Sequence, residues 1–226
     1  ERNQKVTNFK KEQYFEAHSY HTIRSERYFT EIVKATIVKC YQFAVSVNQH
    51  DVDYMFFSLP ALRGICEEYI AEKFIFEQFN DEKDEIIFLR HICDHLKSCI
   101  AQWKYFELNR GDQPLYYEDN FPQRLKESEE QLRDIIKSKL PAITSKSFFP
   151  SVYYMSKQTG LTELYNYLYH ATSTFVHFSP SNLLRMGWGN LPDIKFSASN
   201  FKLYYKDFCM FYSLLLLSKL CEWQSS

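Results

Sequence analysis

Glycine and proline, the residues that most often end regular structure, are scarce in this chain and separate segments with helical periodicity. The 226 residues include only 5 glycines and 7 prolines. So few turn-forming residues favour a small number of long elements over many short strands. Because 45% of the residues are hydrophobic and 24% are charged, as in ordinary globular proteins, we expect these elements to pack around a core.

Apolar residues recur every three or four positions in the first third of the chain, which predicts helices. The first predicted segment runs from Asn8 to Val47, as one helix or two in series. The second runs from Ala61 to Phe79, with Ser58 as its capping residue and Pro60 in its first turn. Its apolar face would consist of Leu62, Ile65, Cys66, Tyr69 and Phe76.

The rest of the chain continues this pattern up to a break between residues 177 and 199. Further helices are predicted over residues 86–108, after an acidic first turn, and over residues 125–140, 150–157, 162–177 and 200–223. The fold class is therefore all-α: a single-domain bundle of about six or seven helices over residues 1–226. We expect the segments 161–178 and 200–223 at its centre, and the charged 125–140 helix on its surface. The last helix is apolar enough to require burial in the core or in a homodimer interface.

Net charge and cysteine usage restrict the protein class. A net charge of −1 gives no global field that would attract nucleic acid or an anionic membrane. The six cysteines lack a Cys-x-x-Cys pair and lie in apolar segments, so we expect them reduced and buried, as in a cytoplasmic protein. The start of the chain lacks the apolar core of a signal peptide, and the most hydrophobic run, Phe208 to Ser218, has about half of the roughly 20 residues that a membrane span requires. No phosphate loop, paired metal-ligand motif or nucleophile elbow is present, so neither a membrane association nor a cofactor or metal is predicted.

A segment without charge carries a stripe of polar residues. From Leu164 to Leu184 there is no Lys, Arg, Asp or Glu, and an uncharged helix is normally buried over most of its circumference. A buried polar group without a hydrogen bond costs about 1–3 kcal/mol, so polar residues there should face a polar partner or a cleft. The alternative is that neighbouring backbone groups satisfy them. The stripe on one helical face comprises Asn166, His170, Ser173 and His177.

Arg63 and Glu67 lie one turn apart among apolar neighbours in the predicted 61–79 helix. An arginine four residues before a glutamate is the less favourable order for a surface ion pair. If this face is buried, the pair should also bond another group, and the His170, Ser173 and His177 stripe is the candidate. The alternative is an exposed ion pair that contributes well under about 1 kcal/mol.

A second group of polar residues lies in the predicted 86–108 helix. The segment Arg90 to His95 resembles the Arg-x4-His motif of the HEPN (higher eukaryotes and prokaryotes nucleotide-binding) superfamily. The resemblance implies a HEPN-like helical dimer that cuts RNA without a metal, with Arg90 and His95 as catalytic residues. His95 would act as general acid or base on the ribose 2′-hydroxyl, while Arg90 stabilises charge on the phosphate. The alternatives are a solvated charged face, or a metal site at His91 and His95 for which no third ligand is identifiable.

A different resemblance covers about residues 55 to 220. The patterns that carry it are Leu62-Arg63-x3-Glu67-x-Tyr69, Phe149-Pro150-Ser151 and Leu164-Tyr165-x3-Tyr169-x3-Ser173-x3-His177-x-Ser179-Pro180. They resemble an uncharacterised bacterial family among the domains of unknown function, family 5677, some relatives of which are similar to components of phage-defence or toxin-type loci. Residues 1–50 would then form N-terminal helix or helices outside the family-like core. The resemblance implies a site at Arg63, Glu67, Ser173 and His177.

Two functional hypotheses from different classes follow from these patterns. The first is a HEPN-like helical domain of a bacterial defence or toxin-type system that acts as a metal-independent endoribonuclease. The second is a non-catalytic sensor, scaffold or partner-binding module in which the polar cluster is structural. The candidate partners are a second copy of the chain, RNA, or a partner protein of a defence locus.

Overall fold

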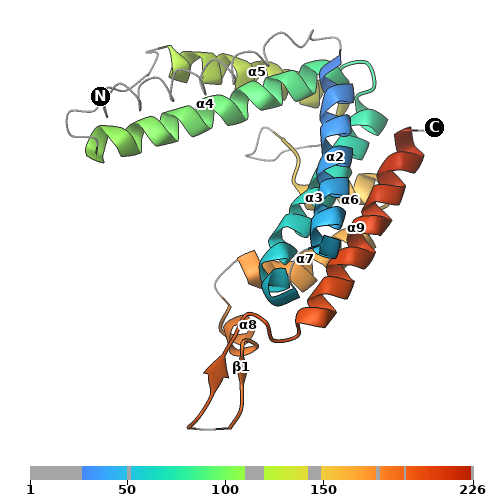
Figure 1. Ribbon diagram of the computed structural model, residues 1–226. Helices are drawn as coiled ribbons and strands as arrows, with labels where there is room; N and C mark the ends of the chain where they lie inside the picture. The colour runs from blue at the N-terminus through green and yellow to red at the C-terminus, as the bar shows by residue number, and fades with distance from the viewer. Residues whose placement is uncertain are drawn as a thin grey trace, which may run out of the picture. The chain divides into compact units, whose positions relative to one another are not determined.

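The fold was analysed in a computed structural model, which describes residues 27–49, 52–109, 120–141, 149–176, 179–190 and 192–224 (Figure 1). These residues are almost entirely helical, and the strands among them form one small hairpin, so the all-α prediction is confirmed. The chain divides into two compact units: residues 1–31 with 81–138, and residues 32–80 with 139–226. The first boundary lies inside a helix, which explains why no linker composition marks it in the sequence. None of the described helices is long and apolar enough to cross a membrane.

The first unit is built on α4 (Lys83–Asn109) and α5 (Phe121–Lys139), close to the predicted bounds. An ion pair of 2.7 Å between Lys97 Nζ and Glu129 Oε1 joins the two helices. Most of α5 is exposed, so its prediction as a surface helix is confirmed. The buried side chains of the two helices recur at helical spacing: Ile86, Leu89, Cys93 and Leu96 of α4, with Leu132 and Ile136 of α5.

The second unit is centred on α3 (Leu59–Gln78), which contacts the 3-10 helix η3 (Val52–Ser58) and the helices α6 (Val152–Gln158), α7 (Thr162–Val176) and α9 (Lys202–Gln224). The prediction that α7 is buried over most of its circumference is wrong, because only Leu168 and Thr172 are buried and most of its other residues are half-buried. Its central position stays a prediction, and α7 does pack against α3. The uncharged residues of α7 include tyrosines and hydroxyl residues, which can lie at a surface with their polar ends in water.

Two local predictions about α3 also require correction. Ser58 precedes the helix but its side chain makes no capping hydrogen bond, because it already has helical dihedral angles (φ −83°, ψ −22°) as the last residue of η3. A capping side chain needs the extended backbone that Ser58 does not adopt. Phe76, expected on the apolar face, is 40% exposed, whereas the other four predicted residues of that face are buried.

The helix α9 buries one face and exposes the other. Leu216 is fully buried, and the Sγ of Cys40 in α2 (Tyr28–Gln49) donates a hydrogen bond of 3.3 Å to the carbonyl oxygen of Ser213. Core burial is therefore confirmed for this face. On the opposite face Phe211 and Leu214 are exposed. The buried face consists of Tyr205, Phe208, Cys209, Ser213, Leu216 and Leu220.

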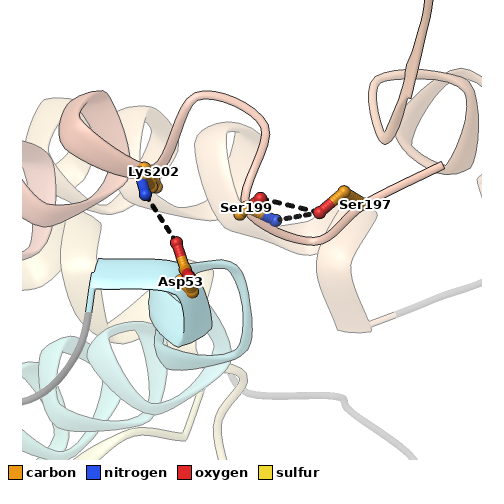
Figure 2. A network of polar contacts seen from close by, with 4 residues as sticks. All are labelled: Asp53, Ser197, Ser199 and Lys202. Atoms are coloured by element: carbon orange, nitrogen blue, oxygen red, sulfur yellow. Dashed lines mark hydrogen bonds and ion pairs between the residues drawn. The ribbon is translucent and has the colours of Figure 1, made fainter. Parts of the chain in front are cut away.

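A small hairpin occupies the segment for which the sequence predicted only a break. After the short helix α8 (Pro180–Leu184), β1 (Gly187–Trp188) pairs antiparallel with β2 (Lys195–Phe196). Gly189 has a φ of 105°, a conformation that favours glycine in the turn. The chain then enters α9 through the hydrogen-bonded hydroxyls of Ser197 and Ser199, and Lys202 Nζ lies 2.6 Å from Asp53 Oδ1 of η3 (Figure 2). This ion pair anchors the start of α9 to η3.

Candidate functional site

Arg63 and Glu67 form a largely buried ion pair on α3. The Nε of Arg63 donates a hydrogen bond of 2.7 Å to Glu67 Oε1, and the two side chains are only 18% and 29% exposed. The guanidinium carbon of Arg63 lies 4.4 Å from the centre of the Tyr169 ring on α7. The Arg63 guanidinium therefore has a neighbour on a second helix, and that neighbour is an aromatic ring. The predicted contact with the His170, Ser173 and His177 stripe stays a prediction.

One edge of the Arg63 guanidinium lacks a hydrogen-bond acceptor. Its Nη1 is buried from solvent and has no hydrogen-bond partner among the described residues. Arginine is always charged and presents five N–H donors, and an unpaired buried donor costs about 1–3 kcal/mol. Glu67 and Tyr169 thus hold the guanidinium in place, while part of its donor capacity is unused.

A row of three tyrosines extends from this ion pair across α7 to α6. We call Tyr153, Tyr165 and Tyr169 the tyrosine row. The ring centres of Tyr165 and Tyr169 lie 5.4 Å apart, and those of Tyr153 and Tyr165 lie 6.2 Å apart. At the far end, Lys157 Nζ lies 4.4 Å from the centre of the Tyr153 ring. The row therefore has a cationic side chain at each end.

Burial and charge alter the acidity of Tyr165 in the middle of the row. Burial raises the pKa of its phenol, and the negative charge of Glu67 raises the pKa further, whereas the charge of Arg63 lowers it. The Tyr165 hydroxyl consequently keeps its proton at neutral pH and can both donate and accept hydrogen bonds beside the ion pair.

The turn between α6 and α7 brings the three rings of the row together. Ser151 caps α6 by accepting a hydrogen bond of 3.2 Å from the backbone N–H of Tyr154. Gly160 follows α6 with a φ of 69°, and the N–H of Leu161 donates to the carbonyl oxygen of Ser156 at 2.8 Å. A glycine in the left-handed conformation, with a backbone hydrogen bond between residues five positions apart, is a common way for a helix to end. The chain can then reverse into α7, which begins at Thr162.

The predicted polar stripe of α7 lies to one side of the face that contacts α3. His170 is exposed and Ser173 is half-buried, while His177 lies outside the described residues. The contact of Arg63 with α7 is made by Tyr169, so its predicted contact with His177 stays a prediction. The sequence reasoning treated tyrosine as an apolar core residue, although Tyr165 and Tyr169 were part of the family pattern. Tyr165 and Tyr169 could have been singled out from that pattern, whereas Tyr153 lies outside it.

The Arg90 to His95 group lies on an accessible face of α4. Arg90 Nε donates a hydrogen bond of 2.8 Å to Asp94 Oδ2, with side chains 40% and 56% exposed. His95 is also exposed; its Nε2 lies 3.6 Å from Cys99 Sγ, and its ring stacks on that of His91. No group of three or more potential His, Cys, Asp or Glu metal ligands is present within the described residues. The catalytic roles of Arg90 and His95 stay predictions.

A further polar contact, which the sequence reasoning missed, joins α2 to α3 in the core. Thr36 Oγ1 donates a buried hydrogen bond to Glu72 Oε1, and one turn away the exposed Lys39 Nζ pairs with Glu68 Oε1. Glu72 is only 3% exposed, and its second carboxyl oxygen has no hydrogen-bond partner within the part of the chain that the structure describes. Burial raises the pKa of Glu72 to about 8. The signal in the sequence was a glutamate among apolar residues on the buried side of α3.

Comparison with known proteins yields one family assignment. Neither the curated proteins nor the solved structures include a match. A family model described as a family of unknown function (DUF5677) matches residues 27–192, beginning and ending earlier than the 55–220 segment of the sequence resemblance. The match spans most of the chain and contains α2, α3, α6 and α7, with both ends of the tyrosine row. The chain therefore belongs to the DUF5677 family.

Proposed function

We propose that this chain is a binding module that recognises an anionic oxygen group of a ligand through Arg63. The observation that carries the proposal is the guanidinium, which Glu67 and Tyr169 fix in place while its Nη1 has no acceptor. The planar fork of arginine suits carboxylate and phosphate groups, which accept two parallel hydrogen bonds. A guanidinium that is already oriented loses little conformational freedom when such a group binds.

A purely structural role accounts less well for the same geometry. A buried ion pair contributes to stability only when its remaining donors and acceptors are also satisfied, and apolar residues of similar size often serve the fold better. Arg63 keeps an unsatisfied donor beside a row of polar aromatic residues. These features favour a site that is completed by a ligand.

The proposal places the chain in the second of the two functional classes, as a non-catalytic sensor or partner-binding module. The first hypothesis, a metal-independent endoribonuclease acting through Arg90 and His95, stays a prediction, as do a defence or toxin setting and a homodimer. The two hypotheses name different residues, so substitutions can distinguish them.

Titration with small anions tests the proposal directly. Acetate and inorganic phosphate would be added to ¹⁵N-labelled protein while the Arg63 Nε–H resonance is followed by NMR, with Arg63→Lys used to assign it. We expect a saturable shift at millimolar concentrations in the wild type, because a single charge-assisted contact gives weak affinity. The matched control is Arg90→Lys, which alters another arginine–carboxylate pair of the same spacing and should leave the response unchanged. A wild-type protein whose Arg63 signal is indifferent to both anions would contradict the proposal.

A further inference from the structure

We infer that the exposed face of α9 is a docking surface for a second copy of the chain, which binds it through its own α9 in antiparallel orientation. The pairing brings Phe211 against Leu214 of the second copy, and Asp207 next to Lys219 of the second copy. It involves other residues than the Arg63 site and does not depend on the proposed function.

A row of exposed residues runs along the face of α9 opposite the buried one. The steps between these residues alternate between three and four positions, and every member is exposed. This is the spacing of the residues through which two helices of a coiled coil contact each other. We call these residues the exposed row of α9: Tyr204, Asp207, Phe211, Leu214, Ser218 and Cys221.

The apolar part of this face is large enough for a dimer interface. Tyr204 is 59% exposed, Phe211 61% and Leu214 51%. Tyr167 of α7, itself 50% exposed, continues the face, because its ring centre lies 6.1 Å from that of Phe208, which lies 6.1 Å from that of Tyr204. Since an aromatic side chain can bury about 150–250 Å², these exposed parts offer roughly 400 Å² of apolar area. At the usual apolar share of about 60%, the interface spans about 700 Å² per copy, close to the roughly 800 Å² of a standard one.

The apolar and the charged residues of α9 select the same register. In an antiparallel pair in which Phe211 packs against Leu214 of the second copy, the two-fold symmetry repeats this contact. The same register places Asp207 opposite Ser218 of the second copy, one residue from its Lys219. In a parallel pair each Asp207 would instead face the Asp207 of the other copy, and like charges repel. Both features therefore favour the antiparallel arrangement.

Asp207 and Lys219 are available for a contact between copies. Asp207 is exposed and Lys219 is half-buried, and neither forms an ion pair within the residues that the structure describes. A lysine can lay its stem along an apolar surface and keep its charge at the edge. The other three charged residues of α9 already have contacts within the chain: Lys202 with Asp53, Lys206 with the carbonyl oxygen of Asn48, and Glu222 with Ser218.

The polar members of the exposed row make the dimer weak. Asp207 and Ser218 interrupt the apolar contact, so they fix the register at a cost in affinity. Because α9 buries its other face in the core of its own chain, each copy folds by itself. Substitutions on the exposed face therefore change association without unfolding the chain.

Sedimentation equilibrium of the intact chain, at concentrations from about 1 µM to about 1 mM, tests the inference. We expect the wild type to change from monomer to dimer with a dissociation constant of roughly 1–100 µM. Leu214→Asp should weaken association at least about tenfold, because it places an unpaired carboxylate in the contact. The matched control is Val38→Asp, which alters an apolar side chain of α2 that is also 51% exposed and should change nothing.

Exchange of the two charges tests the register. Asp207→Lys alone, or Lys219→Asp alone, sets like charges next to each other at both ends of the contact and should weaken association at least about tenfold at low salt. The double variant restores opposite charges and should dimerise within about threefold of the wild type. Melting curves at low protein concentration verify that each variant is folded.

Three outcomes would overturn the inference. A wild type that stays monomeric up to about 1 mM would leave this face to a different partner. A dimer that Leu214→Asp leaves intact would be formed by another surface. Single charge variants that associate as tightly as the wild type would contradict the antiparallel pairing. None of these results changes the proposed function, because the binding of anions at Arg63 is measured separately.

Discussion

Glu72 is the residue whose chemistry is changed most by its position. Its carboxyl group is enclosed between α2 and α3, with a hydrogen bond from Thr36 to one oxygen and, among the residues that the structure describes, no partner for the other. An ionised carboxylate there would leave an unpaired charge in a medium of low polarity. Burial is the main cause of the rise in the pKa of Glu72 to about 8, and the charge of the neighbouring Glu68 adds to it. Glu72 is therefore mostly protonated at neutral pH.

The protonation of Glu72 predicts how the free energy of unfolding depends on pH. Below about pH 4.5 the residue is protonated in both the folded and unfolded states. As the pH rises from 4.5 to about 8, the unfolded chain releases this proton while the folded chain keeps it, so the stability falls through this range. Each pKa unit corresponds to about 1.4 kcal/mol, so the total loss should amount to several kcal/mol.

Replacement of Glu72 by glutamine tests this prediction, because glutamine has the same shape and does not titrate. We expect Glu72→Gln to be more stable than the wild type at pH 8 to 9 and to lose little stability between pH 5 and 8, as measured by urea unfolding. Glu77→Gln, at a more exposed ion pair of α3, is the control and should follow the wild-type pH profile. Parallel profiles for wild type and Glu72→Gln would show that Glu72 is charged in the fold.

At the scale of elements, the sequence predicted the bounds of the helices better than their burial or the structure of the segments between them. Periodicity placed α4 and α9 within a few residues of their observed bounds, because both have regular buried faces. It misjudged α7, since the absence of charge does not distinguish a buried helix from one with surface tyrosines. The hairpin around Gly189 was missed because its two-residue strands are too short to show any alternation.

The two faces of α9 offer a matched pair of substitutions. Leu216 is fully buried, whereas Leu214, two residues earlier on the same helix, is 51% exposed. Leu216→Asp should cost several kcal/mol, because it places an unpaired charge in the core, and should yield insoluble or unfolded protein. Leu214→Asp should change the stability by less than about 0.5 kcal/mol. Soluble expression and melting temperatures of the two variants measure the difference, and an equal loss in both would show that the exposed face is also buried in solution.

At the scale of the whole molecule, the sequence identified the ion pair of the candidate site but not the residues around it. Arg63 and Glu67 were found because a charged pair among apolar neighbours is expected to be buried and therefore to contact a further group. In the structure Arg63 contacts an aromatic ring. Tyr153 and Lys157 were not found, because nothing in the sequence indicates that the turn at Gly160 brings α6 beside α7. The candidate site thus depends on tertiary contacts between helices. The sequence predicted these helices and their order, but not which of them lie side by side.

RNA cleavage separates the two functional classes for the molecule as a whole. If the chain is a binding module, wild type and His95→Ala should show the same absence of RNA cleavage in the presence of EDTA. The two proteins should also have similar melting temperatures, because the exposed His95 side chain contributes little to stability. Arg63→Ala should lower the melting temperature by several degrees, since it leaves the carboxylate of Glu67 without its partner. A ribonuclease would behave differently: the wild type would cleave RNA in EDTA, and His95→Ala would lose about two orders of magnitude of that activity while remaining folded. That second result would assign the chemistry to α4 and would contradict the assignment of the chain to the non-catalytic class.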